Sequence, residues 1–139
     1  MDIDTAKYQL ITGMKQEQER IVRDYITAYN NFDVGGMTKD LDENIVFENI
    51  SNGRVDLRTV GLEAFINQAE AATGYFKTRE QTVTSWVFAA DKVTVDIDYR
   101  AVLQVDIPNG PQAGDTLNLI GQSEFEFLNG RIIRLKDIS

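Results

Sequence analysis

The sequence predicts an α+β domain in which a curved antiparallel sheet carries helices on one of its faces. Three observations favour this class. The first third of the chain has helical periodicity, the second half has four long alternating segments, and short turn signals join those segments. Because sequential strands joined by short turns run antiparallel, the second half is expected to form a meander.

The N-terminal part is expected to be helical. Residues 1–15 are weakly patterned and predict an arm or a short helix ahead of a single domain over residues 16–139. From residue 16 apolar side chains recur at three- and four-residue spacing: Ile21, Tyr25, Ala28, Tyr29 and Phe32. Asp33 and two glycines should end this helix, and a short helix over 34–41 should follow.

Strands are expected over the rest of the chain, with one further helix. A strand over 44–51, the turn "SNG" and a return strand over 54–59 precede a helix over 62–73, which Gly74 terminates. The four long strands are expected at 79–89, 92–107, 115–128 and 131–138.

Composition and charge exclude several partners. With 14 basic and 22 acidic residues the net charge is −8, which argues against nucleic acid and against an anionic membrane surface. No stretch approaches ~18 consecutive apolar residues, so no membrane span is expected. The first residues lack the pattern of a secretory signal, so we expect a cytoplasmic protein.

The chain contains no histidine and no cysteine. That composition excludes a Ser-His-Asp triad, a Cys–His pair and a His-based zinc or iron site. A hard cation held by carboxylates stays open, but no EF-hand spacing is present. We therefore expect neither a metal nor a cofactor, and acid–base chemistry would fall to Asp, Glu, Tyr or Lys.

Alternation along the strands predicts which side chains face inward. Odd-numbered positions are apolar in 92–107 and 115–128, and Phe47 extends the same face to the first strand. Four polar residues interrupt these inward faces, and Tyr25 on the first helix can join them: Asn49, Tyr99, Ser123 and Asp137. Each alone is typical of a satisfied structural residue, but together they predict a lined pocket.

The outward parity carries apolar residues as well. Val102, Ile120, Leu128 and Ile132 fall on positions where a monomer would favour polar groups. We therefore expect a homodimer built through the outer face of the sheet. Trp86, the only tryptophan, could face either the pocket or this interface.

The pattern resembles the nuclear transport factor 2-like superfamily, which includes SnoaL-type polyketide cyclases, ketosteroid isomerase, limonene epoxide hydrolase and small subunits of ring-hydroxylating dioxygenases. The resemblance rests on "IVRDYITAYNNFDVGGMTKDLDENIVFEN", "GLEAFI" and "SEFEFLNGRIIRLKD", and covers about residues 16–138. It implies a cone-shaped, cystatin-like α+β barrel, whose curved antiparallel sheet wraps around N-terminal helices and leaves a pocket at its open end. It also implies a homodimer.

The resemblance transfers site residues only in part. The helix tyrosine of ketosteroid isomerase corresponds to Tyr25 here, its aspartate base to Asn49 and its aspartic acid to Ser123. This chain therefore lacks the catalytic base, because an amide cannot accept the proton. The limonene epoxide hydrolase pattern matches this chain at Asn49 and Asp137. This chain lacks the hydrolase's strand tyrosine, arginine and acid, because those positions fall on Phe47 and on Tyr99 to Ala101. The SnoaL-type cyclases use an aspartate with a histidine, so only Asp137 could serve here.

Three functions follow from this pattern. As an enzyme (isomerase, cyclase or hydrolase), the chain would use Asp137 as general acid or base, Asn49 to orient a water or carbonyl, and Tyr25 or Tyr99 as donor. As a binding protein, it would hold a small apolar ligand with Phe47, Trp86, Tyr99 and Ser123. As a structural protein, it would be a dimerising subunit whose pocket is filled by side chains.

Overall fold

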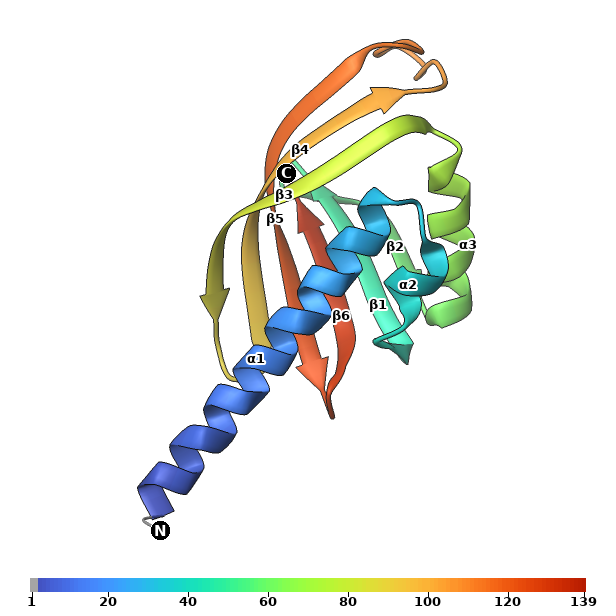
Figure 1. Cartoon of the computed structure of the whole chain (residues 1–139). Helices are drawn as coiled ribbons and strands as arrows, with labels where there is room; N and C mark the ends of the chain where they lie inside the picture. The colour runs from blue at the N-terminus through green and yellow to red at the C-terminus, as the bar shows by residue number, and fades with distance from the viewer. Residues whose placement is uncertain (1–2) are drawn as a thin grey trace.

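The computed structural model describes residues 3–139 and shows helices against one six-stranded sheet (Figure 1). In chain order the elements are α1 (Ile3–Asn30), α2 (Val34–Thr38), β1 (Leu41–Ser51), β2 (Arg54–Val60), α3 (Leu62–Thr73), β3 (Phe76–Phe88), β4 (Lys92–Leu103), β5 (Thr116–Leu128) and β6 (Arg131–Ile138). The fold class is therefore the α+β class that the sequence predicts. No helix within residues 3–139 is long and apolar enough to cross a membrane.

Helix α1 is longer than the periodicity indicates. It begins at Ile3 instead of near residue 16, and its N-terminal half reaches beyond the edge of the sheet (Figure 1). Leu10, Ile11 and Met14 on this half are exposed, whereas Ile21 and Val22 are buried in the core. Because these side chains stay exposed, the projecting turns do not carry the regular apolar spacing of the buried part of α1. Residues 1 and 2 of the predicted arm lie outside the described residues.

A tight connection joins α1 to α2. Phe32 takes a positive φ of 58°, and the Asp33 carboxylate caps α2 by accepting a hydrogen bond from the Gly36 amide at 2.9 Å. A Cβ at Gly36 would collide with this carboxylate and with the Ala28 side chain. The glycine therefore permits a close approach between the two helices.

The strand order is β2-β1-β6-β5-β4-β3, and the sheet is open, with β2 and β3 at its edges. Strands β3 to β6 form the predicted antiparallel meander. One pair differs from the antiparallel expectation: β1 runs parallel to β6, the last strand of the meander. This pairing brings the first and last strands together inside the sheet, next to the edge strand β2.

The predicted inward parity is correct for β4 and for most of β5. Val93, Val95 and Ile97 are buried on the concave side, against α1. The strand predicted to continue to residue 107 ends at Leu103 instead, because the next residues fold into a loop in which the Ile107 amide donates to the Pro111 carbonyl. The alternation of apolar and polar residues over 104–107 therefore belongs to this loop and not to the strand.

Two β-bulges change the parity that the sequence indicates. Phe127 pairs with Ile132 and Glu126 with Arg134, so Ile133 is an extra residue in β6. As a result Ile132 is fully buried, and its predicted place on the outer face is wrong. A similar shift in β3, between Val83 and Ser85, turns Trp86 inward beside the core while Thr82 and Thr84 remain exposed.

Candidate functional site

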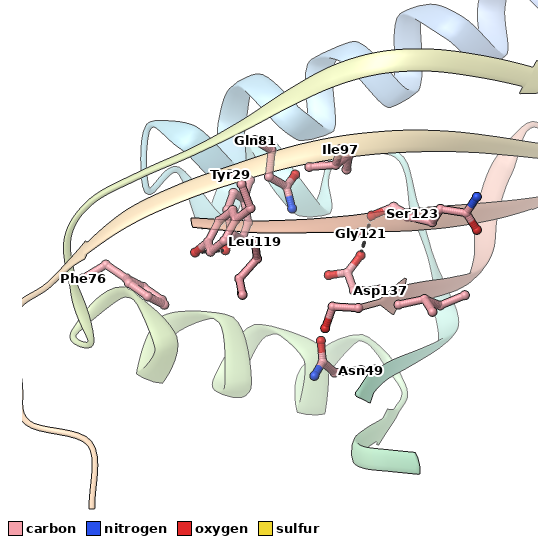
Figure 2. A pocket seen from close by; sticks show the side chains of 13 residues that line it. Tyr29, Asn49, Phe76, Gln81, Ile97, Leu119, Gly121, Ser123 and Asp137 are labelled. Atoms are coloured by element: carbon pink, nitrogen blue, oxygen red, sulfur yellow. Dashed lines mark hydrogen bonds between the residues drawn. The ribbon is translucent and has the colours of Figure 1, made fainter. Parts of the chain in front are cut away.

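Strand pairing sets three polar side chains in one row on the concave face. In the sheet register Asn49 of β1 pairs with Asp137 of β6, and Asp137 pairs with Ser123 of β5. Asn49 is far from the other two residues in the sequence, and the three side chains still stand side by side (Figure 2). The parallel β1–β6 pair is what brings Asn49 into the row.

The row forms one end of a cavity of about 240 Å³. Tyr29, Phe76 and Leu119 lie toward the other end of this cavity, away from Asp137 (Figure 2). The full lining is Tyr29, Asn49, Phe76, Gln81, Ile97, Tyr99, Leu119, Gly121, Gln122, Ser123, Asp137, Ile138 and Ser139. Such a mostly apolar hollow with a few polar groups is typical of a small-molecule site.

A second cavity of about 150 Å³ lies on the side of α1, α2 and α3. Its lining comprises Tyr25, Tyr29, Met37, Phe47, Asn49, Leu57, Phe65, Gln68, Ala69, Ala72, Arg79 and Asp137. The two cavities share Tyr29, Asn49 and Asp137. Asp137 is thus the carboxylate that borders both hollows.

Asp137 has the chemistry of a proton-transfer group. Burial raises the pKa of the Asp137 carboxyl to about 6, and a hydrogen bond from Ser123 partly opposes that shift. Ser123 Oγ donates this bond to Oδ1 at 2.7 Å. Oδ2 of Asp137 has no hydrogen-bond partner in the described chain, so one carboxyl oxygen is held and the other is free. Near neutral pH both protonation states are populated.

The tyrosines supply hydroxyl groups that remain protonated. The hydroxyls of Tyr29 and Tyr99 are 2.9 Å apart, so one donates to the other and the second keeps a proton to offer. Burial raises the pKa of Tyr25, Tyr29 and Tyr99 above the ordinary tyrosine value. They can therefore act as hydrogen-bond donors near neutral pH, but not as bases.

The structure brings most of the predicted site residues together. Asn49 and Asp137 line both cavities, Tyr99 and Ser123 line the first, and Tyr25 and Phe47 line the second. The Asn49 amide donates to Asp56 Oδ1 of β2 at 2.8 Å, which leaves its oxygen for a ligand. Trp86 lines neither cavity.

Trp86 lies among other side chains instead. It stacks on Phe88, with ring centroids 5.7 Å apart, and the Arg23 guanidinium lies 4.7 Å from its ring. The β3 bulge and this stacking turn the indole toward the core cluster, where it packs without lining either hollow.

Tyr29, Arg79 and Gln81 line the cavities but lie outside the predicted site set. The helical period predicts a core position on α1 for Tyr29, and the strand pattern alone predicts no role for Arg79 or Gln81. A signal exists for the last two, because Arg79, Gln81 and Val83 alternate with exposed residues along β3. Within residues 3–139 no cluster of three or more acidic side chains could hold a metal ion.

Comparisons with known proteins agree with this arrangement. A sequence model of the family described as "SnoaL-like domain" matches residues 22–135. No curated protein matches the chain.

Solved structures share the fold at low identity. A candidate polyketide cyclase from Xanthomonas campestris pv. campestris is 20% identical, with a TM-score of 0.78 over 91% of this chain and 92% of that one. A protein from Mycobacterium tuberculosis described as an LEH-like epoxide hydrolase is 20% identical, with a TM-score of 0.70 over 88% and 82%. An NTF2-like protein of unknown function from Burkholderia pseudomallei K96243 is 14% identical, with a TM-score of 0.72 over 87% and 88%. At these identities the likeness establishes the fold and leaves the reaction open.

Proposed function

Because the chain belongs to the SnoaL-like domain family, we propose that it is an acid–base enzyme acting on a small, mostly apolar carbonyl compound. Asp137 is the acid–base group in this proposal. The observation that carries it is a carboxyl group with a pKa of about 6 at the junction of two cavities. A carboxyl group tuned to this range can both accept and return a proton near neutral pH.

The reaction uses groups that line the first cavity. The Asp137 carboxylate takes a proton from the carbon next to the substrate carbonyl, while Ser123 holds Oδ1 in place. The free hydroxyl of the Tyr29–Tyr99 pair donates to the carbonyl oxygen, where negative charge develops. Asp137 then returns the proton to the substrate, at the same or another carbon, and so completes an isomerisation or prepares a ring closure.

Ligand binding without turnover is the second candidate. It is favoured by Asn49, whose amide nitrogen is bonded to Asp56 and whose side chain has no useful basicity. In that case the Asp137–Ser123 pair would fix the orientation of a bound carbonyl compound, and no proton transfer would take place.

Hydrogen–deuterium exchange separates the two functions. A set of cyclic ketones in D₂O is incubated with wild-type protein, Asp137→Asn and Asp98→Asn, and loss of α-protons is followed by NMR. Asp98 is an exposed aspartate of β4 and serves as the matched control. We expect wild type and Asp98→Asn to exchange at least one ketone about 10²–10⁴-fold faster than Asp137→Asn does. Equal rates in all three proteins, with ketone binding retained, would establish the binding function instead.

A further inference from the structure

Arg79 is a buried cation whose hydrogen bonds are incomplete. The residue is 4% exposed, and its Nε donates to the backbone oxygen of Tyr29 at 2.8 Å. Its Nη2 is buried and has no partner. Unpartnered buried nitrogens of arginine are costly, because a guanidinium offers five N–H groups and none can be removed by deprotonation.

No carboxylate of the described residues forms an ion pair with this guanidinium. Among the residues that the structure describes, the ion pairs involve Arg20, Arg23, Lys39, Lys92 and Arg134, and none involves Arg79. The faces of the guanidinium are covered instead, since its central carbon lies 3.7 Å from the centroid of the Tyr29 ring and 4.6 Å from that of Phe32. Stacking leaves the edge of the guanidinium, which carries the N–H groups, as the part still in need of an acceptor.

Arg79 belongs to the lining of the second cavity, together with Asp137. The rest of that lining is largely apolar and includes Met37, Phe47 and Phe65. A single unpaired guanidinium in such a lining has the chemistry of a carboxylate site, because its parallel N–H groups match the two oxygens of a carboxylate.

We propose that Arg79 binds a carboxylate of the ligand in the second cavity, so that the substrate is a small keto acid. The acid's carboxylate completes the hydrogen bonds of Arg79, and its apolar carbons contact Met37, Phe47 and Phe65. Its carbonyl extends past Asp137 into the first cavity, toward the Tyr29–Tyr99 hydroxyls. The keto part rests on the proposed function, whereas the binding of a carboxylate by Arg79 does not require turnover.

Benzoate and benzamide test this site, because they have nearly the same shape and differ in charge. A cavity of about 150 Å³ is large enough for a benzene ring. We expect wild-type protein to bind benzoate at least tenfold more tightly than benzamide by isothermal titration calorimetry. Arg79→Met, which keeps the length of the stem and removes the charge, should bind the two equally. Arg100→Met removes a charge from an exposed position on β4 and should keep the preference.

Several outcomes are decisive. Equal affinities of wild-type protein for benzoate and benzamide overturn the carboxylate site, and this comparison needs no variant to fold. A benzoate preference that survives in folded Arg79→Met also overturns it. Asp137→Asn belongs only to the exchange assay, and benzoate, which has no proton on the carbon next to its carboxylate, is bound without turnover. If the exchange assay shows no turnover, the benzoate and benzamide affinities still test Arg79. If those affinities show no carboxylate site, the exchange of neutral ketones still tests the proposed function.

Discussion

At the scale of single residues, the character of Asp137 comes from what surrounds its carboxyl group. The groups around it are Ser123 on β5, Asn49 on β1, Tyr25 and Tyr29 on α1, and Arg79 on β3. Burial outweighs the Ser123 hydrogen bond and raises the pKa of the carboxyl to about 6. A carboxyl group with a raised pKa stabilises the folded protein less when it is ionised than when it is protonated.

This predicts a dependence of stability on pH. The contribution of Asp137 is fully present below its ordinary pKa of 3.8 and is lost as the pH rises through about 6. Wild-type protein should therefore lose stability relative to Asp137→Asn between pH 4.5 and pH 7.5, by at most on the order of 3 kcal/mol. Denaturant unfolding of both proteins at the two pH values measures the change. A difference that is the same at both pH values would contradict the raised pKa.

At the scale of secondary structure, irregular pairing decides which side chains meet the core. The extra residue in β6 places both Ile132 and Leu135 inside, although strict alternation would separate them. Ile133 is only partly buried. The same bulge lies a few residues before Asp137, so it sets the parity with which the end of β6 reaches the cavities.

A pair of neighbouring substitutions tests the bulge. Ile132→Ala should lower the free energy of unfolding by about 2–5 kcal/mol, because it opens a cavity at a fully buried position. Ile133→Ala removes the same atoms from a partly exposed site. Its loss of unfolding free energy should be smaller than that of Ile132→Ala by about 1 kcal/mol or more. Urea unfolding of both variants gives the comparison. A larger loss of stability for Ile133→Ala than for Ile132→Ala would contradict the bulge and favour strict alternation along β6.

At the scale of the whole molecule, the outer face of the sheet keeps exposed apolar side chains. Ile120 of β5 is 82% exposed and Leu128 is also exposed, although Ile132 no longer belongs to this set. The chain carries a net charge of −8, which opposes nonspecific association. Apolar residues that persist on a charged sheet face are typical of a specific interface between copies of a chain.

We therefore still predict a homodimer through the outer face of the sheet. Light scattering on wild-type protein at about 50 µM should give the mass of a dimer, since a specific homodimer interface holds at micromolar concentrations. Ile120→Lys should give a monomer, because a charge at the centre of the apolar set must be desolvated on association. Ile11→Lys, at an exposed position on the projecting part of α1, is the control and should remain dimeric. A monomeric wild-type protein would remove this prediction.

The sequence by itself determined the class of fold, the meander and most of one face of the pocket. Hydrophobic periods of two and of three to four residues are local properties, so they identify the concave side of β4 and the buried face of α1 without any tertiary information. The polar interruptions at Tyr99, Ser123 and Asp137 could be recognised for the same reason. The absence of histidine likewise restricts acid–base chemistry to other groups.

Only the tertiary structure decided which of these residues share a cavity and what their surroundings do to them. The parallel pairing of β1 with β6 and the bulges in β3 and β6 depend on contacts between distant segments, which no local period records. The raised pKa of Asp137 and the unpartnered Nη2 of Arg79 depend on burial by side chains from several elements. These features arise only when the chain is packed, because the free energy of a charged group depends on the surrounding side chains that exclude water from it.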